Sequence, residues 1–431
     1  MSDPFDQNRP ARCGEILSRA IGRGLVREED TALLFHDLSL VDQRVAQIQS
    51  AFPPTALHAI SVKANPLAGL LRRLTDLGVG LEAASLPELH LALSTGASPD
   101  RIVFDSPVKT LREISFALDE GVAINADSLG EIDRIAALLG EQPTRSRIGI
   151  RINPQIGAGT IGMTSTADRY SKFGVPLSEF RNQLRGAFAR HPWLQGLHLH
   201  IGSQSCPMDL LLRGVESVLA FAQETNRDLQ SLGAPNRIQV VDIGGGLPVP
   251  YRKGEKMPDV VEYGRRLASR CPDLFSREFR LITEFGRYVH AHAGWAVSRV
   301  EYVKHSAAGD TIMIHLGADM FLRRCYRPEE WHHELSLLDG RGRVKRGDTR
   351  PYTVAGPLCF SGDIIARGIP LARPEPGDYL VVHDAGAYTL SMWSRYNSRQ
   401  IPRVLGYEQQ GQHFTILKER EELNDLSDFW S

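Results

Sequence analysis

Lys63 stands where a lysine could do covalent chemistry. It ends an apolar run that begins at His58, and the turn-forming pair Asn65-Pro66 follows it. An amine at the carboxyl end of a strand lies at the mouth of a sheet or barrel, where it can form a Schiff base with an aldehyde cofactor. The alternative, for Lys63 considered alone, is a surface lysine just past a strand.

Chemically useful side chains end several other apolar runs in the same way. They are Glu82 and Ser85, Arg151 and Asn153, His200 and Ser203, the triple glycine Gly244-Gly245-Gly246, and Glu284 with Arg287. Catalytic groups of a (β/α)8 barrel come from the carboxyl ends of several strands. The recurrence therefore predicts one site that all of these strand ends share.

Two of these features suit pyridoxal phosphate. The glycines 244 to 246 allow backbone N–H groups to approach a phosphate dianion, although a triple glycine can also be only a tight loop. Glu284 offers a carboxylate that could keep the pyridine nitrogen protonated, which makes the ring an electron sink. A structural ion pair with Arg287 is the alternative for this glutamate.

The segment His198-Leu199-His200 places two imidazoles on the same side of a strand, so a metal site is a competing interpretation. No third ligand falls at a persuasive spacing along the sequence, and we therefore predict no metal. The flat ring of His200 suits stacking on another ring, and His198 is expected to be an interior histidine with its hydrogen bonds satisfied.

The elements that position these residues form a repeated β/α pattern. Helix-like segments with apolar residues three and four apart separate the apolar runs. The runs are His58 to Ala64, Val79 to Ser85, Arg101 to Pro107, Val122 to Ser128, Arg147 to Pro154, Gly196 to Ser203, Arg237 to Gly246 and Leu281 to Arg287. Eight strands over this span predict an α/β fold with a (β/α)8 TIM barrel at residues 46–293, rather than a doubly wound sheet.

A mainly β domain is predicted at residues 294–431, because strand-like runs there lack regular helices between them. The runs are Trp295 to Lys304, Thr311 to Leu316, Tyr352 to Leu358 and Tyr379 to Asp384. Residues 1–45 form an N-terminal segment whose run Thr31 to Asp37 either joins the β domain or caps the barrel. The first dozen residues and the tail beyond Lys418 are charged and expected to be mobile.

Composition excludes several classes of partner. The 431 residues carry 50 basic and 51 acidic side chains, a formal charge of -1 that would attract neither nucleic acid nor a membrane surface. No apolar run approaches a membrane span and the first residues do not look like a signal peptide, so a cytoplasmic location is expected. Five scattered cysteines predict reduced thiols rather than a disulfide framework or a zinc site.

With these motifs the chain resembles the fold-type III pyridoxal phosphate decarboxylases, the group of ornithine, lysine, arginine and diaminopimelate decarboxylases, and most of all its diaminopimelate decarboxylases. The resemblance runs from about Thr31 to Tyr407. Its motifs here are Ser61-Val62-Lys63-Ala64-Asn65, Ser171-Lys172-Phe173-Gly174, His200-Ile201-Gly202-Ser203-Gln204, Gly244-Gly245-Gly246, Glu284-Phe285-Gly286-Arg287, Gly356-Pro357-Leu358-Cys359-Phe360-Ser361-Gly362-Asp363 and Gly386-Ala387-Tyr388.

The resemblance implies roles for individual residues. Lys63 would carry the cofactor, pyridoxal 5'-phosphate, and His200 would stack on its ring. The cofactor-binding set would further include Ser203, Gly244, Gly245, Gly246, Glu284, Gly286, Arg287 and Tyr388. Family members are usually head-to-tail homodimers with shared active sites, and Cys359 would enter the neighbouring site to protonate the substrate Cα. Without the resemblance, Cys359 would be a small buried hydrophobe.

Substrate contacts are implied for Arg287, Arg323, Phe360 and Tyr388, with two departures from the family pattern. Phe360 stands where the diaminopimelate decarboxylases carry a glutamate, and an aromatic ring offers an ammonium only a cation–π contact. Arg323 keeps the arginine of a substrate segment, but Arg324 replaces its proline and Arg327 its tyrosine. Extra guanidiniums would favour a substrate with an additional carboxylate, or they pair at a dimer surface.

We therefore predict an α-decarboxylase of an amino acid: diaminopimelate, a related diamino acid or a carboxylate-bearing intermediate. An amino-acid racemase of the alanine racemase type is the enzymatic alternative, but there an arginine meets the pyridine nitrogen where this chain has Glu284. A pyridoxal phosphate carrier protein is the non-enzyme alternative, and it lacks a β domain. The sequence leaves open the far end of the substrate, the stereocentre attacked and the pathway.

Overall fold

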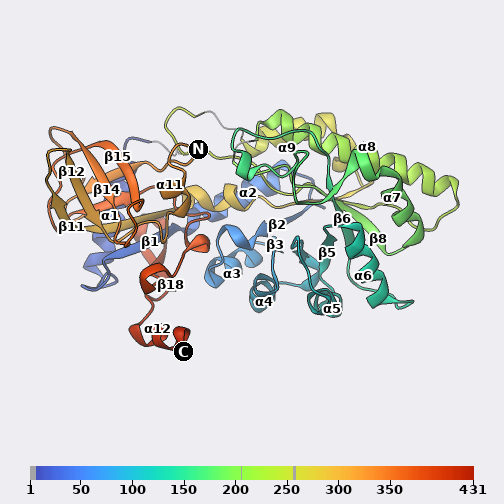
Figure 1. Ribbon diagram of the computed structural model, residues 1–431, viewed down its shortest axis with the longest axis horizontal. Helices are drawn as coiled ribbons and strands as arrows, with labels where there is room; N and C mark the ends of the chain where they lie inside the picture. Colours follow the sequence, from blue (N-terminus) through green and yellow to red (C-terminus); the bar gives the residue numbers. More distant parts are fainter. Residues whose placement is uncertain (1–5, 205, 256–258) are drawn as a thin grey trace. The chain divides into compact units, whose positions relative to one another are not determined.

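The computed structural model describes residues 6–204, 206–255 and 259–431, so small parts of the predicted segments 1–45 and 46–293 lie outside it. The described chain divides into two compact units (Figure 1). One unit comprises residues 42–249 and 259–289, and it is called the barrel unit below. The other comprises residues 6–41, 250–255 and 290–431, and it is called the β unit.

Eight parallel strands close the barrel unit into a ring, which confirms the predicted TIM-like barrel. Each strand pairs with the next, and the ring closes because β10 pairs with β2. The strands are β2 (Leu57–Ser61), β3 (Gly80–Ala83), β4 (Ile102–Phe104), β5 (Ala123–Ala126), β6 (Ile148–Asn153), β8 (Leu194–His198), β9 (Val240–Asp242) and β10 (Arg280–Thr283). The two-residue strand β7 (Val175–Pro176) adds to β6.

Helices follow the strands around the outside of the ring (Figure 1). They are α3 (Ala68–Asp76), α4 (Leu86–Ser94), α5 (Leu111–Glu120), α6 (Leu129–Leu139), α7 (Leu177–Arg190), α8 (Met208–Ser231) and α9 (Val260–Arg270), with α2 (Leu38–Ala51) before β2. Local capping explains several starts: the side chains of Ser85, Thr110 and Ser128 each accept a hydrogen bond from the first turn of the helix that follows. Ser85, a candidate site residue, therefore caps α4.

An apolar cluster fills the inside of the barrel. Its members are Leu57, Ala59, Val103, Ala123, Val240 and Ile282. Side chains two residues apart on a strand point to the same face. Five polar residues lie two positions beyond a member of this cluster: Ser61, Asp105, Asn125, Asp242 and Glu284. The strand period therefore brings these polar groups to the carboxyl-terminal mouth of the barrel.

The β unit is a nine-stranded sheet in which β1 (Ala32–Asp37) pairs with β11 (Gly294–Lys304) and β17 (Arg403–Glu408). The early run therefore joins the β unit. The remaining strands are β12 (Asp310–Ile314), β13 (Leu335–Leu338), β14 (Arg350–Ala355), β15 (Ile364–Leu371), β16 (Tyr379–Val382) and β18 (His413–Lys418). The sequence analysis did not predict β13, β15, β17 or β18.

Both ends of the described chain are helical, in α1 (Arg9–Gly22) and α12 (Leu423–Trp430). The expectation of a mobile start is wrong where α1 begins, because this helix packs into a core, whereas no residue of α12 is buried and mobility of the tail stays a prediction. One face of α1 is apolar, and Ile16 and Leu17 pack in one core with the stacked rings of Phe35 and Trp295. Two short helices complete the description, α10 (Gly286–His290) and α11 (Leu322–Tyr326).

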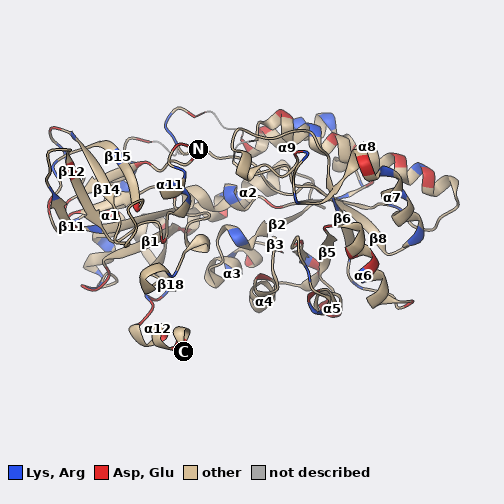
Figure 2. Cartoon of the chain, in the orientation of Figure 1, with Lys and Arg blue, Asp and Glu red and all other residues tan. Residues whose placement is uncertain are grey.

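Both signs of charge are interspersed over the surface helices α7, α8 and α9 (Figure 2). No helix in residues 6–204, 206–255 and 259–431 is both long and apolar enough to cross a membrane. All five cysteines are free thiols.

Candidate active site

Lys63 lies on a single helical turn, Val62–Ala64, directly after β2. Its amine donates a hydrogen bond to Glu82 Oε2, and the Lys63 side chain is 37% exposed while that of Glu82 is fully buried. The amine can therefore be reached from outside, and its position is set by a carboxylate on the neighbouring strand β3.

Four carboxyl groups gather at the mouth of the barrel. Glu82 comes from β3, Asp105 follows β4, Asp242 ends β9 and Glu284 follows β10, and all four are buried. The Glu82 carboxyl interacts with that of Asp105, and the Asp242 carboxyl interacts with that of Glu284. Buried carboxyl groups that lie this close to one another cannot all be ionised without a large cost, so some of them retain a proton.

The pKa directions agree with protonated carboxyls. Burial raises the pKa of Glu82 to about 7, with Asp105 adding to the shift and Lys63 opposing it. Burial likewise raises the pKa of Asp242 to about 7, although its Oδ1 accepts a hydrogen bond from the Gly244 N–H. Burial, together with repulsion from Asp242, Asp105 and Glu82, raises the pKa of Glu284 well above its ordinary value.

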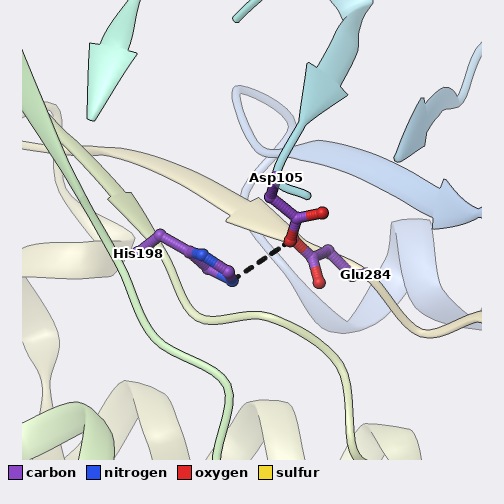
Figure 3. Close-up of side chains that lie close together, drawn as sticks. All are labelled: Asp105, His198 and Glu284. Carbon is purple, nitrogen blue, oxygen red and sulfur yellow. Dashed lines mark ion pairs between the residues drawn. The ribbon is translucent and has the colours of Figure 1, made fainter. Parts of the chain in front are cut away.

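His198 is the residue for which the sequence expectation is wrong. It is fully buried, but neither ring nitrogen has a hydrogen-bond partner within the described part of the chain. Its Nε2 lies 3.7 Å from Asp105 Oδ2 and 3.5 Å from Glu284 Oε1, and the ring points toward the two carboxylates (Figure 3). Burial lowers the pKa of His198 well below its ordinary value, so the ring is neutral.

The ring of His200 is held in one orientation. Its Nδ1 accepts a hydrogen bond from the Gly245 N–H at 3.1 Å, so the proton of the neutral ring is on Nε2. Burial lowers the pKa of His200 to about 3, with Arg151 and Lys63 adding to the shift. A neutral, flat and oriented ring is suited to stacking on an aromatic group.

The triple glycine is required by close backbone packing. A Cβ at Gly245 would lie 2.6 Å from the Glu284 carbonyl oxygen, and Gly244 and Gly246 have positive φ angles of 65° and 91°. The N–H groups of Gly244 and Gly245 already donate to Asp242 and His200. A phosphate held at this loop would rely on other donors more than on these two amides.

Ser203 and Arg287 supply such donors. The Arg287 guanidinium approaches the Ser203 hydroxyl with Nη2 at 3.0 Å and Nε at 3.3 Å. The neighbouring Gly286 packs closely on β2, since a Cβ there would lie 3.0 Å from the Ser61 Cβ. A hydroxyl beside a guanidinium is a good donor pair for an anion.

Arg151 and Asn153 have structural partners. Arg151 lies 3.7 Å from Asp127 and over the ring of Phe173, and Asn153 donates to the Asp168 carbonyl oxygen. These contacts hold the segment that carries the Ser171 to Gly174 motif.

Four of the predicted site residues belong to the β unit. The Arg323 guanidinium lies between two rings, 4.7 Å from the centre of Trp331 and 5.0 Å from that of Tyr388. Tyr388 has a positive φ of 57°, so its backbone is held in a conformation that side chains disfavour.

The other two are Cys359 and Phe360, on one loop. The Cys359 side chain is exposed, so the alternative of a buried hydrophobe is wrong, and its backbone is held by Asn397 and Tyr396. The Phe360 ring stacks on Tyr326 with 5.1 Å between ring centres.

The additional arginines are occupied elsewhere. Arg324 donates to the carbonyl oxygens of Ile365, Pro328 and Trp331, each at 2.7 Å. Arg327 is half-exposed and faces Glu329 and Glu330. Of the arginines at 323, 324 and 327, Arg323 is thus the one placed beside another predicted site residue.

Comparison with known proteins now decides the family. The profile described as "Pyridoxal-dependent decarboxylase, pyridoxal binding domain" matches residues 38–291, more than half of the chain. The chain belongs to the pyridoxal-dependent decarboxylases. The matching profile describes decarboxylases, so it supports the decarboxylase prediction over both the racemase and the carrier alternatives.

Relatives of this decarboxylase span nearly its whole length. It is 34% identical to the diaminopimelate decarboxylase of Pseudomonas fluorescens, over 80% of this chain and 79% of that one. It is 29% identical to that of Aquifex aeolicus, over 95% and 94%. The crystal structure of the Helicobacter pylori diaminopimelate decarboxylase with L-lysine matches with a TM-score of 0.83 and 27% identity, over 95% of this chain and 99% of that one.

The barrel of this decarboxylase fits the cofactor of its family, pyridoxal phosphate. An exposed amine, an oriented neutral imidazole, a donor pair for an anion and a buried carboxyl with an unpartnered oxygen, Glu284 Oε1, meet at one mouth. These are the types of group that an aldehyde, a ring face, a phosphate and a pyridine nitrogen would each require.

The sequence analysis missed Asp105 and Asp242 as members of the site. Spacing along the chain gave no sign of the Asp105, His198 and Glu284 cluster, because its members follow three separate strands. The available signal was the strand period: each of the two aspartates lies two residues beyond a valine of the barrel interior.

Proposed function

We propose that this enzyme removes the α-carboxylate from an amino acid whose far end carries a second carboxylate. The relatives that it matches over most of their length are diaminopimelate decarboxylases, and diaminopimelate is one such amino acid. The observation that carries the proposal is the position of the Arg323 guanidinium, which lies over the rings of both Trp331 and Tyr388. A guanidinium fixed in this way matches the planar fork of a carboxylate.

The barrel residues would bind and orient the cofactor. Lys63 would hold its aldehyde carbon, Ser203 and Arg287 its phosphate, His200 its ring face and Glu284 its pyridine nitrogen. When bound, pyridoxal phosphate supplies an electron sink for the electron pair left at Cα as CO2 departs.

Cys359 is the proposed proton donor to Cα, and we propose that it serves the active site of a second subunit in a head-to-tail homodimer. The exposed thiol supports a role outside its own fold. The Cys359 N–H donates to Asn397 Oδ1 and the Tyr396 hydroxyl donates to the Cys359 carbonyl oxygen, and these bonds fix the loop that presents the thiol. A positioned thiol can transfer one proton per turnover and recover it from solvent.

Phe360 is expected to disfavour substrates with an ammonium group at the far end. Its ring stacks on Tyr326 and offers no charge to an ammonium group. We therefore expect an amino acid with a distal carboxylate but no distal ammonium to be a better substrate than meso-diaminopimelate.

A CO2-release screen tests this substrate assignment. We expect carboxylate-bearing amino acids to give a higher kcat/KM than meso-diaminopimelate with the wild type. A Phe360→Glu variant should raise the relative kcat/KM for meso-diaminopimelate about tenfold, because a charged pair with the distal ammonium replaces a ring contact. The Phe360→Gln variant, of similar size but uncharged, is the control. No CO2 from any candidate, or stereochemical inversion without CO2, would contradict the proposal.

Mixing two inactive variants tests the shared site. Lys63→Ala and Cys359→Ala should each be inactive as purified. If the two residues act across subunits, mixing the variants under conditions of subunit exchange should restore part of the activity. Activity that stays absent in the mixture, while both variants elute as dimers, would contradict the shared site.

A further inference from the structure

The buried groups at the barrel mouth form one continuous chain of contacts. The Lys63 amine contacts Glu82, and the Glu82 carboxyl interacts with that of Asp105. His198 lies between Asp105 and Glu284, and the Glu284 carboxyl interacts with that of Asp242. Its central members, Asp105 and His198, have no role in the proposed function. Figure 3 shows the two carboxylates side by side, facing the imidazole.

We propose that Asp105 and His198 are positioning residues that join the Lys63–Glu82 pair to the Glu284–Asp242 pair in one proton-sharing network. The inference rests on the proposed function at one point, the assignment of Glu284 to the pyridine nitrogen of the cofactor. Neither residue would touch the substrate.

The geometry of His198 is the first support. The ring is fully buried, and its Nε2 faces Asp105 Oδ2 at 3.7 Å and Glu284 Oε1 at 3.5 Å. A neutral imidazole has one N–H, and carboxyl oxygens of Asp105 and Glu284 on one side of the ring favour the tautomer with the proton on Nε2. That N–H lies where it can hold either carboxylate in place.

The balance of charge is the second support. Asp242 accepts hydrogen bonds from the Gly244 amide and Asn125, and Asp105 and Glu284 face a neutral ring. Several buried carboxylates that meet neutral partners cannot all be ionised. The network therefore retains protons at neutral pH.

The charged and titratable groups around Glu284 come from every neighbouring strand. They are Lys63 after β2, Glu82 on β3, Asp105 after β4, Arg151 on β6, His198 on β8, His200 after β8 and Asp242 on β9. Negative charge from Asp105 keeps a proton on the Glu284 group, whereas the N–H of His198 stabilises the Glu284 anion. Asp105 therefore raises the pKa of Glu284, and the N–H of His198 lowers it.

Titration of the cofactor-free protein tests the network. Carboxyl signals of the protein labelled with ¹³C-glutamate are followed through neutral pH, and the Glu284 signal is identified by its loss in Glu284→Gln. We expect the Glu284 midpoint to move to lower pH in Asp105→Asn and to higher pH in His198→Leu. His198→Gln, whose amide can donate near the Nε2 position, should restore the midpoint toward that of the wild type.

Asp319→Asn is the control, because Asp319 is also buried but pairs with Arg399 in the β unit and is not among the groups that shift Glu284. A Glu284 midpoint unchanged in Asp105→Asn, or moved equally by Asp319→Asn, would overturn the proposal. So would one tightly bound metal ion per chain, found by elemental analysis and lost in His198→Leu. Because no substrate is used, failure of the decarboxylation screen would leave this test intact.

Discussion

At the scale of single residues, the site depends on which groups are buried and which are open. Lys63 is partly exposed while its partner Glu82 is fully buried. The buried carboxylate therefore positions the amine, which remains accessible to a reactant from the exposed side. Sequence spacing predicted Lys63, His200 and Glu284 because each ends an apolar run. It could not predict that His198 would be buried without a hydrogen bond, because that depends on what faces it across the barrel.

Substitution of Lys63 should separate chemistry from folding. We expect Lys63→Ala to lower kcat by at least about a hundredfold, because the amine that would hold the cofactor is lost. The visible absorbance of bound cofactor should also be lost after gel filtration.

The control is Lys304→Ala, at an exposed lysine of β11, which should keep both activity and absorbance. Turnover by Lys63→Ala close to the wild-type rate would contradict the assignment of this lysine.

At the scale of elements, close backbone packing brings the loop after β9 against its neighbours. Gly245 packs against the Glu284 carbonyl, and its N–H orients His200. The sequence predicted that these glycines were needed, but for access to a phosphate. The structure adds another reason, because a side chain at Gly245 would meet protein backbone and not open space.

Gly245→Ala should therefore disturb folding as well as cofactor binding. The added Cβ would lie 2.6 Å from a backbone oxygen that cannot rotate away. We expect a loss of about 1 to 3 kcal/mol in the free energy of unfolding, measured by chemical denaturation without cofactor.

Gly162→Ala is the matched control, since nothing lies within 4 Å of a Cβ at that exposed glycine. Equal stability of the Gly245→Ala and Gly162→Ala variants would show that the loop can move aside.

At the scale of the whole molecule, residues far apart in the chain complete each unit. In the β unit, Arg9 of α1 makes two hydrogen bonds to Asp384 across 375 positions, and His292 approaches the same carboxylate at 2.6 Å. Asp384 has a positive φ of 58° and precedes the Gly386-Ala387-Tyr388 motif. Helix α1 thus supports the segment that carries Tyr388.

Arg9→Ala should lower stability in a pH-dependent way. Burial raises the pKa of Asp384, but Arg9 and His292 outweigh it and hold the pKa below its ordinary value of 3.8. A carboxyl whose pKa is lowered by folding adds stability above its unfolded pKa and loses it as the pH falls. Removing one partner of this buried pair should cost roughly 3 to 5 kcal/mol at neutral pH.

The measurement is the free energy of unfolding at neutral and acidic pH. The gap between wild type and Arg9→Ala should narrow as the pH falls below the ordinary aspartate pKa. Arg12→Ala, which removes a more exposed pair with Asp6, should lower the free energy of unfolding much less than Arg9→Ala does. A gap that is constant with pH would mean that Arg9 stabilises the protein by packing alone.

The sequence by itself determined the order of strands and helices in the barrel, because periodicity and local capping are properties of neighbouring residues. It also determined which side chains end the strands, and the family motifs that they form. Only the tertiary structure decided that Asp105, His198 and Glu284 meet, that Arg9 binds Asp384, and that Arg324 is taken up by carbonyl oxygens. These contacts arise when the barrel closes and the sheet assembles. The spacing of residues along the chain does not indicate their distance across the barrel or across the sheet.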